Sequence, residues 1–436
     1  MSASYLRRGL DRPAVFELFA RHLPPNRDWL LAAGLGPSLR LITELRFGPE
    51  QLAYLGSIGF EDEFCDYLSG FRFSGNVDAM PEGTLCFAAE PLVRVTAPRI
   101  EAQLVETLLL NQINFQTMIA TKAARVALAA GGGEPGAAAS VIDFSPRRDH
   151  GIDAAMKVAR SAAVAGVEGT SNVAAAMRYG LEAVGTMAHS YVLSFESEPQ
   201  AFRAFLEDHP ERGVLLVDTY DSLRGVENAA AAARETGVPL AGIRLDSGDL
   251  LELSRGARRL LDEAGLAETR IAASGDLEER RICELVAAGA PIDLWGVGTD
   301  LGTSRDSPVV NGVYKLVADA GPAGGWRDVA KHSPDKATVG GAKQVHRRID
   351  GGRMAGDTIV AAEEEAPGEA LLVPAVRKGE IVRREQLASV RARATDQLRA
   401  LPDALRLPEP GAHPEPYPVE LSPMLARRAG LSSAPG

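Results

Sequence analysis

The feature that most constrains this fold is a regular alternation of segment types between about residues 140 and 300. Short apolar, β-rich runs are each followed by a polar or glycine-bearing turn and then by an alanine- and leucine-rich helical stretch. The predicted strands are 140–144, 163–169, 182–188, 213–219, 240–246, 270–276 and 293–299, and the predicted helices include 199–206, 222–236, 249–264 and 277–288. Such alternation implies parallel strands joined by right-handed crossovers. It favours an irregular, TIM-like α/β barrel, with an open doubly wound sheet as the alternative.

The segments on either side of this block have a different composition. Their predicted elements are an amphipathic helix around 14–21, a long helix from 101 to about 129, short strands near 356–375, a helix from about 384 to 398 and a proline-rich tail from 402 onward. The glycine-rich run "AAGGGEPGAAAS" at 129–140 is typical of a domain junction. We therefore expect a barrel over 138–345 and a second α+β domain formed from the N-terminal (1–130) and C-terminal (346–436) segments.

Composition and charge argue against several classes of function. The 436 residues carry a formal net charge of -11, which disfavours general binding to nucleic acid. A local cationic pocket for a small anion is still compatible with this net charge. No apolar stretch reaches transmembrane length and "MSASYLRRGL" lacks the apolar core of a signal peptide, so we expect a cytoplasmic protein that does not bind membranes. Cys65, Cys86 and Cys283 are widely spaced, which is typical of small buried side chains rather than of disulfides or a zinc site.

Polar residues gather where the predicted strands end. They lie in "FSPRR" at 144–148, "GTSN" at 169–172, "TMAH" at 186–189, Asp218, "RLDSGD" at 244–249, "SGD" at 274–276 and "GTD" at 298–300. In an α/β barrel the carboxyl ends of the strands open on one face, where loops vary without disturbing the strands. The sequence therefore predicts one functional site at this face.

The residue types at these strand ends favour anionic ligands. Arg147, Arg148 and Arg244 supply planar cationic groups that suit a carboxylate or a phosphate. The small residues of "GTSN", "ASGD" and "GVGT" let backbone N–H groups approach an anion. Asp246 and Asp249 can accept hydrogen bonds from a sugar diol or hold Mg²⁺ through water. The same motifs also suit helix caps, a turn and a solvated arginine pair, which are the structural alternatives.

A histidine follows the run "AVGTMA", in which Ala183 to Met187 are predicted to form a short buried strand. His189 lies just beyond that strand, and Asp218 ends the next one. We expect Asp218 to accept the Nδ1–H of the imidazole and to leave Nε2 as a nucleophile or base. The alternative is a hydrogen-bonded histidine with a purely structural role.

These motifs also occur together in a known order. The runs "DFSPRRDHG", "GTSNVAAAMRYG", "VGTMAHSYV", "VDTYD", "GIRLDSGDL", "ASGDL", "GVGTDL", "VYKLV" and "KHSPDKATVGGAKQVHR" resemble those of nicotinate phosphoribosyltransferases in order and spacing. "NVDAMPEGTLCFAAEPLVRV" and "ETLLLNQINFQTMIATKAAR" extend the resemblance over nearly the whole chain. It implies a type II phosphoribosyltransferase fold, in which an irregular α/β barrel joins a domain built from both chain ends. It also implies a homodimer with active sites at the interface.

The activity that the resemblance implies is transfer of a phosphoribosyl group from phosphoribosyl pyrophosphate to nicotinate. The products are nicotinate mononucleotide and pyrophosphate, a step of NAD salvage. ATP is the family's co-substrate, hydrolysed through a phosphohistidine in the presence of Mg²⁺. By motif position, the catalytic residues are His189, its acidic partner Asp218 and the ribose-hydroxyl acceptor Asp246; the substrate-binding residues are Phe144, Arg147, Ser171, Thr186 and Arg244; and the 5-phosphate cradle is Gly275, Asp276, Gly298 and Thr299.

Three features of the sequence bear on substrate choice and activity. Ser171 stands where related amide-using enzymes carry an aspartate, which favours nicotinate because a carboxylate there would repel it. Family members usually open with a segment resembling "TDLYELTM", whose tyrosine stacks on the pyridine across the dimer, whereas this chain begins with "MSASYLRRGL". Gly340 and Gly341 replace a common "PG", which would make that loop more mobile. The alternatives are an enzyme for nicotinamide or another pyridine, and a weakened or silent paralogue that binds a nucleotide.

Overall fold

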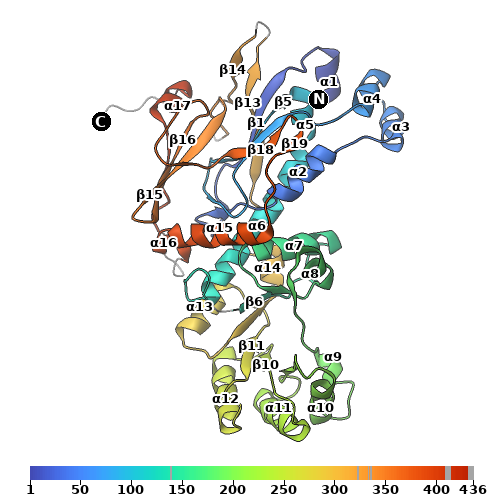
Figure 1. Ribbon diagram of the computed structural model, residues 1–436, viewed down its shortest axis with the longest axis vertical. Coiled ribbons are helices and arrows are strands. Elements are labelled where there is room, and N and C mark those ends of the chain that lie inside the picture. Colours follow the sequence, from blue (N-terminus) through green and yellow to red (C-terminus); the bar gives the residue numbers. More distant parts are fainter. Residues whose placement is uncertain (138–139, 322–323, 332, 334–335, 408–413, 431–436) are drawn as a thin grey trace. The chain divides into compact units, whose positions relative to one another are not determined.

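The chain divides into two units, both drawn in Figure 1. The computed structural model describes residues 1–137, 140–321, 324–331, 333, 336–407 and 414–430. We call Lys122–Pro308, with residues 406–407, the barrel unit. We call Met1–Thr121, Val309–Leu405 and the tail from residue 414 the composite unit. The predicted barrel start at 138, part of the lysine-rich loop and part of the proline-rich tail lie outside the described residues.

The barrel unit is built on a curled parallel sheet of short strands. They are β6 (Ser140–Asp143), β7 (Gly169–Thr170), β8 (Glu182–Ala183), β9 (Val214–Leu216), β10 (Gly242–Leu245), β11 (Arg270–Ala273) and β12 (Leu294–Val297). Their order in the sheet is β8–β7–β6–β12–β11–β10–β9. The first strand pairs with the last, as in a closed barrel, but β8 and β9 form the two edges. The predicted α/β barrel is thus confirmed as a half-barrel that is open between β8 and β9.

Helices follow the strands of the barrel unit. They are α7 (Ile152–Val164), α8 (Val173–Tyr179), α9 (His189–Val192), α10 (Glu198–Asp208), α11 (Ser222–Thr236), α12 (Leu250–Glu263), α13 (Glu279–Ala287) and α14 (Thr299–Thr303). Helix α11 has the bounds that the sequence predicts. Asn172, Asp221 and Asp249 accept backbone N–H groups at the starts of α8, α11 and α12. Such caps satisfy donors that have no partner in a first helical turn.

Two predicted strands of the barrel are wrong over most of their length. The sequence predicts a strand at 163–169, but α7 continues to Val164 and β7 contains only Gly169–Thr170. Ala183 to Met187 do not form a buried strand either, because β8 ends at Ala183 and both of its residues are exposed. The apolar residues before β7 are the buried last turn of α7, and a short apolar run cannot be assigned to helix or strand by periodicity alone.

The composite unit contains three sheets, and the largest combines strands from both parts of the chain. Their orders are β14–β13–β1–β5–β3–β18–β19, β17–β15–β16–β20 and β2–β4. The strands are β1 (Pro13–Ala20), β2 (Leu30–Leu31), β3 (Asn76–Ala79), β4 (Leu85–Cys86), β5 (Pro91–Pro98), β13 (Gly312–Ala320), β14 (Trp326–Asp328), β15 (Lys343–Asp350), β16 (Arg353–Ala361), β17 (Glu369–Ala370), β18 (Val373–Arg377), β19 (Glu380–Ile381) and β20 (Val419–Leu421). The second α+β domain formed from both ends is confirmed. Residues 309–345, which the sequence assigns to the barrel, belong here because β13 pairs with β1.

The predicted amphipathic helix around residues 14–21 is wrong. These residues form β1, which pairs antiparallel with β13 on one side and β5 on the other. Five consecutive residues of β1 are buried, including Glu17, whose Oε2 lies 2.7 Å from Lys343 Nζ. A central strand that is buried on both faces lacks the alternation of apolar and polar residues that identifies a strand in a sequence.

The helices of the composite unit are α1 (Ser2–Arg7), α2 (Leu35–Glu44), α3 (Pro49–Ser57), α4 (Asp62–Ser69), α5 (Arg99–Leu104), α15 (Leu387–Ala400), α16 (Asp403–Arg406) and α17 (Pro423–Arg428), and α6 (Glu106–Ala130) continues into the barrel unit. The long helix predicted from 101 to 129 is therefore interrupted between α5 and α6. Within the described residues, no helix combines the length and apolar character needed to cross a bilayer.

Candidate active site

Two cavities that share four lining residues lie at the carboxyl ends of the barrel strands. The glycine cavity, about 250 Å³ in volume, is lined by Phe144, Arg147, Arg148, Arg244, Asp246, Ser274, Gly275, Asp276, Gly296, Gly298 and Thr299. The histidine cavity, about 380 Å³, is lined by Phe144, Pro146, Arg147, Ser171, Gly185, Thr186, Met187, Ala188, His189, Arg244 and Asp246. Every residue that the family resemblance assigns to the site lines one of them, except Asp218. The strand ends therefore converge on one hollow of the barrel unit.

Arg244 connects the two cavities. It lies in β10, and its guanidinium donates from Nε to Ser274 Oγ at 2.8 Å and from a terminal nitrogen to Thr186 Oγ1 at 2.6 Å. The second terminal nitrogen donates to Asp246 Oδ1 at 2.9 Å. The same guanidinium lies 5.5 Å from the centre of the Phe144 ring. An arginine held on three sides has lost its rotational freedom before any ligand binds, which favours binding of an anion in a fixed orientation.

Asp246 follows β10 and faces both cavities. Its Oδ1 accepts hydrogen bonds from Arg244 and from Ser274 Oγ. Burial opposes the charged form, but these hydrogen bonds and the charge of Arg244 outweigh it and lower the pKa of Asp246. The carboxylate is therefore ionised at neutral pH and can accept hydrogen bonds from hydroxyl groups.

His189 is the first residue of α9 and lies over Asp218. Its Nε2 is 3.3 Å from Asp218 Oδ1, and its side chain is 42% exposed whereas that of Asp218 is 1% exposed. These two atoms approach closely but without hydrogen-bond geometry in this conformation. Asp218 Oδ2 is held by the backbone N–H of Asp246 at 3.0 Å and by Ser247 Oγ at 2.7 Å.

The predicted orientation of the imidazole is wrong. The sequence predicts that Nδ1 faces Asp218, but the ring presents Nε2 to it. The prediction places His189 directly after a strand, whereas the strand ends at Ala183 and His189 begins a helix. The nitrogen left for chemistry in this arrangement is Nδ1.

The glycine cavity depends on backbone positions that exclude a side chain. Gly275 has φ +90°, and a Cβ there would lie 2.0 Å from the carbonyl oxygen of Asp246. A Cβ at Gly296 would lie 2.5 Å from the Phe144 ring. Asp276 has φ 46°, a conformation that costs a non-glycine residue energy and is common at functional turns. The loops at 274–276 and 298–299 thus bring backbone close to the cavity.

The loop after β6 carries residues that line both cavities. Arg147 is exposed, Phe144 is partly buried, and the loop is fixed by Asp143, whose buried carboxylate accepts hydrogen bonds from Ser145 and from Thr170 Oγ1. Burial raises the pKa of Asp149, in the same loop, to about 6, and Ser145 and His150 only partly oppose this.

Some predicted or implied roles go to other residues. Asp249 caps α12, with its Oδ1 accepting from the backbone N–H of Leu251 at 3.1 Å, so it is not a partner of Asp246 in the site. Ser274 and Ser247, which hold Asp246 and Asp218, have no assigned role in the sequence analysis. Ser247 directly follows Asp246 and Ser274 directly precedes Gly275 in the sequence. This proximity to motif residues is the sequence signal that could have identified both serines as part of the site.

A third cavity, of about 350 Å³, lies in the half-barrel and is lined mainly by residues near the starts of the strands. It contains the charged side chains of Glu168, Glu182, Arg212 and Arg270, among others. It shares Phe144, Gly185, Thr186 and Arg244 with the cavities at the strand ends.

The fold and the site together define an α/β-barrel protein whose cavities at the carboxyl ends of the strands carry the arginines and glycine loops that suit anionic small molecules. Comparison with known proteins narrows this class. The family model described as the nicotinate phosphoribosyltransferase (NAPRTase) N-terminal domain matches residues 1–114, and the model of the nicotinate phosphoribosyltransferase (NAPRTase) family matches residues 139–265.

Individual relatives cover most of the chain. The protein named nicotinate phosphoribosyltransferase pncB2 of Mycobacterium tuberculosis is 46% identical over 97% of this chain and 89% of its own. The nicotinate phosphoribosyltransferase of Bacillus subtilis is 43% identical over 80% of this chain and 71% of its own. The crystal structure of human nicotinic acid phosphoribosyltransferase matches with a TM-score of 0.85 at 26% identity, covering 99% of this chain and 98% of that one. This chain belongs to the nicotinate phosphoribosyltransferase family.

Proposed function

We propose that this protein is a nicotinate phosphoribosyltransferase of NAD salvage, which forms nicotinate mononucleotide and pyrophosphate from nicotinate and phosphoribosyl pyrophosphate. The observation that carries the proposal is the position of Arg244. Its guanidinium touches side chains of both cavities and lies near an aromatic ring. One arginine can therefore orient a carboxylate-bearing ring beside a phosphorylated sugar.

The histidine cavity is the proposed nicotinate site. The pyridine ring stacks on Phe144, and its carboxylate meets the cationic groups of Arg147 and Arg244. Ser171 and Thr186 line the same cavity and add no negative charge. These two neutral side chains do not repel a bound carboxylate, which favours nicotinate over nicotinamide.

The glycine cavity is the proposed site of the sugar phosphate. The loops 274–276 and 298–299 offer backbone N–H groups to the 5-phosphate through Gly275, Asp276, Gly298 and Thr299. Asp246, which is ionised and faces both cavities, accepts hydrogen bonds from the ribose hydroxyls.

The chemistry needs positioning more than a strong base. As the bond from the anomeric carbon to pyrophosphate breaks, positive charge develops on the ribose, and the pyridine nitrogen donates its electron pair to form the new C–N bond. The ring nitrogen acquires the positive charge and no proton moves. Cations of the site stabilise the leaving pyrophosphate, and the clamp on nicotinate keeps its nitrogen in line.

His189 is the proposed acceptor of a phosphoryl group from ATP. With Nε2 facing Asp218, the free electron pair is that of Nδ1. The Nδ1–P bond forms as the bond from the γ-phosphorus to the ADP oxygen breaks, and water later hydrolyses the phosphohistidine to inorganic phosphate. Asp218 stabilises the positive charge that the ring gains. The added phosphate charge beside the site biases the product equilibrium.

Mg²⁺ fits this site as an ion carried by the substrate phosphates. Among the described residues, no group of three or more His, Cys, Asp or Glu side chains could hold a metal by itself. Mg²⁺ usually keeps several waters and binds one or two carboxylates together with substrate phosphates. Asp246 is the carboxylate placed to take that part, and the ion would neutralise charge on the leaving pyrophosphate.

A homodimer is the proposed assembly, because apolar side chains are exposed near the histidine cavity. Val173 and Met177 on α8, Leu193 after α9 and Tyr220 after β9 are all exposed. Burial of such side chains against a second subunit would be favourable. Light scattering should give a dimer mass for the wild type and a monomer mass for Met177→Glu, and a monomeric wild type would contradict the assembly.

Product analysis tests the activity. Purified protein is incubated with phosphoribosyl pyrophosphate and either nicotinate or nicotinamide, with and without ATP and Mg²⁺, and nucleotides are quantified by mass spectrometry. We expect nicotinate mononucleotide and stimulation by ATP. Nicotinamide mononucleotide as main product would favour the amide-using alternative. Binding of phosphoribosyl pyrophosphate without any product would favour a silent paralogue.

A further inference from the structure

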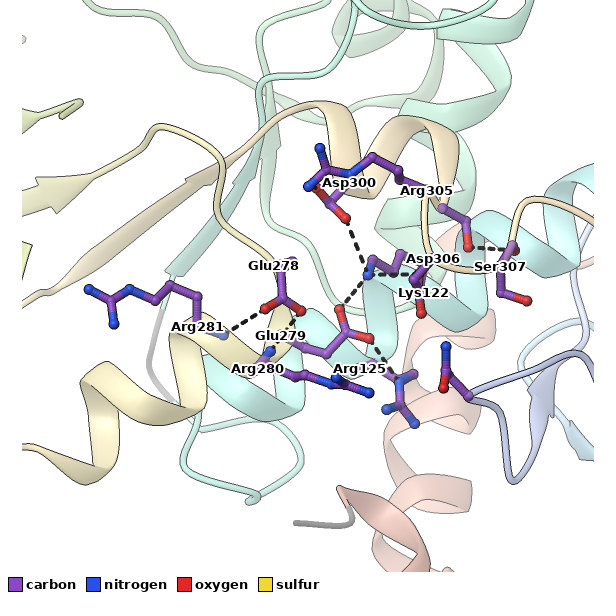
Figure 2. Close-up of polar contacts among 12 residues, drawn as sticks. Lys122, Arg125, Glu278, Glu279, Arg280, Arg281, Asp300, Arg305, Asp306 and Ser307 are labelled. Atoms are coloured by element: carbon purple, nitrogen blue, oxygen red, sulfur yellow. Dashed lines mark hydrogen bonds and ion pairs between the residues drawn. The ribbon is translucent and has the colours of Figure 1, made fainter. Parts of the chain in front are cut away.

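An ionic cluster with a buried centre lies in the barrel unit, outside both cavities (Figure 2). We use the name ionic cluster for Lys122, Arg125, Glu279, Asp300, Arg305 and Asp306. Lys122 comes from α6, and its side chain is 1% exposed. Its Nζ lies 2.5 Å from Glu279 Oε2, 3.0 Å from Asp306 Oδ1 and 3.8 Å from Asp300 Oδ1.

Two acids of the cluster, Glu279 and Asp300, follow the two loops of the glycine cavity in the sequence. Glu279 begins α13, three residues after Asp276, and Asp300 immediately follows Thr299 at the start of α14. The loops come from β11 and β12, which pair in parallel. One ammonium group therefore holds the carboxylates that follow both loops.

Further cations hold the same carboxylates from their other sides. Arg125 Nε lies 3.1 Å from Glu279 Oε1, and a terminal nitrogen of Arg305 lies 2.9 Å from Asp300 Oδ2. Burial disfavours charge on Glu279, but Lys122 and Arg125 outweigh burial and lower its pKa. Burial raises the pKa of Asp300, and Lys122 and Arg305 oppose that rise. Without Lys122, two buried carboxylates would lose a shared counter-charge.

A cluster of this kind is a poor way to stabilise a core. Desolvation of buried ions often cancels their attraction, and apolar replacements of similar volume are often as stable. What an ion cluster provides is a fixed geometry, because each hydrogen bond has a preferred distance and direction. The loops 274–276 and 298–299 contain strained and glycine positions, so their shape needs such support.

We propose that Lys122 is a positioning residue that sets the distance between the two loops and thereby the affinity for phosphoribosyl pyrophosphate. The inference rests on the proposed function, in which these loops hold the 5-phosphate. The nicotinate contacts of Phe144, Ser171 and Arg244 do not include any residue of the cluster, and the loop 274–276 reaches them only through the hydrogen bond from Arg244 to Ser274. Loss of Lys122 therefore acts mainly on phosphoribosyl pyrophosphate, with a smaller effect on nicotinate.

The test is a comparison of KM values for the two substrates in Lys122→Met. We expect KM for phosphoribosyl pyrophosphate to rise about tenfold or more, because displacement of a binding group by about 1 Å has effects of that size. KM for nicotinate should stay within about twofold. The double variant Lys122→Met, Glu279→Gln removes one cation and one anion together, and it should recover part of the lost affinity.

A matched control is Lys343→Met in the composite unit. Lys343 is another buried lysine paired with a buried glutamate, with Nζ 2.7 Å from Glu17 Oε2. The Lys343→Met substitution should lower the melting temperature without a selective change in KM for phosphoribosyl pyrophosphate. If Lys122→Met does not fold, Glu279→Gln replaces it, with a smaller rise expected.

An unchanged KM for phosphoribosyl pyrophosphate in folded Lys122→Met and Glu279→Gln overturns the inference, as does an equal rise for both substrates. A wild type that forms no nicotinate mononucleotide contradicts the proposed function instead. Calorimetric binding of phosphoribosyl pyrophosphate then decides the role of Lys122 separately. Equal affinities of wild type and Lys122→Met, or no binding to either, overturn it.

Discussion

The glycine cavity and the histidine cavity differ in how firmly the chain itself holds them. The glycine cavity rests on four-residue strands, and the carboxylates that follow its loops are tied to Lys122. The histidine cavity is bordered by the two-residue strands β7 and β8 and by the four-residue helix α9, at the opening of the half-barrel. Its key side chain, His189, is 42% exposed.

The difference indicates a division of labour. A phosphate site needs several backbone donors at fixed distances, which a single rigid unit can supply. If the histidine cavity takes a phosphoryl group from ATP, as we propose, it must admit the nucleotide and release the products. The exposed apolar side chains of Val173 and Met177, close in the chain to Ser171 of that cavity, would be covered by the second subunit of the proposed dimer.

The largest expected effect on activity comes from a change in the histidine cavity. His189→Ala should abolish ATP hydrolysis and ATP stimulation, because it removes the imidazole that we propose as the phosphoryl acceptor, while slow uncoupled transfer persists. The measurement is ATP turnover alongside nicotinate mononucleotide formation. His209→Ala, an exposed histidine on the same unit, serves as the control. Full ATP coupling in His189→Ala would remove the proposed role of this histidine.

The next largest effect is expected from a change in the glycine cavity. Gly275→Ala places a Cβ 2.0 Å from the carbonyl oxygen of Asp246, and overpacking of this kind costs about 1–3 kcal/mol. We expect KM for phosphoribosyl pyrophosphate to rise roughly 5- to 150-fold, since 1.4 kcal/mol corresponds to tenfold.

Gly265→Ala is the matched control for this variant. Gly265 also has positive φ, at +77°, but no atom lies within 4 Å of the position that a Cβ would take there, so only the strain is shared. Equal KM values in the two variants would mean that the glycine loop is not held as closely as the structure indicates.

A smaller effect is expected on base selection in the histidine cavity. Ser171→Asp adds a carboxylate to the wall, which should raise KM for nicotinate about tenfold through repulsion at partly solvated distances. KM for nicotinamide should fall or stay unchanged, and Ser171→Asn, which is polar but neutral, is the control. Competition assays with both bases measure the ratio, and an unaltered ratio would exclude Ser171 as a determinant of specificity.

The smallest expected effect concerns the loop that joins the cavities. Burial raises the pKa of Asp149 from 3.8 to about 6, so its stabilising contribution is complete below 3.8 and is lost as the pH rises through about 6. Asp149→Asn stays neutral and should gain on the wild type by on the order of 1 kcal/mol between pH 4 and 7, after allowance for solvent screening. Urea unfolding at several pH values measures it, and parallel curves would contradict the assigned pKa.

Much of the barrel could be predicted because its signals are local. Helix α11 has the expected bounds of 222–236, since a polar cap precedes it and a glycine with positive φ follows it. Strand β1 could not be predicted from its pattern, because burial between β13 and β5 removes the alternation. The prediction of the imidazole orientation was wrong, because the orientation depends on where the chain enters α9.

Lys122 was missed for a related reason. It stands in a helix whose neighbours are mostly apolar, and the sequence shows only that Lys122 and Arg125 interrupt the run "ATKAARVALAA" on one helical face. Their partner Glu279 is 157 residues from Lys122 in the chain.

The sequence by itself determined which side chains meet at the carboxyl ends of the barrel strands. Alternating strands and helices make a parallel sheet, in which all carboxyl ends lie at one edge. Tertiary structure alone decided where the half-barrel opens, which imidazole nitrogen faces Asp218 and which cation holds the two loops. These features depend on distances between segments far apart in the chain, and no local pattern of residues encodes such distances.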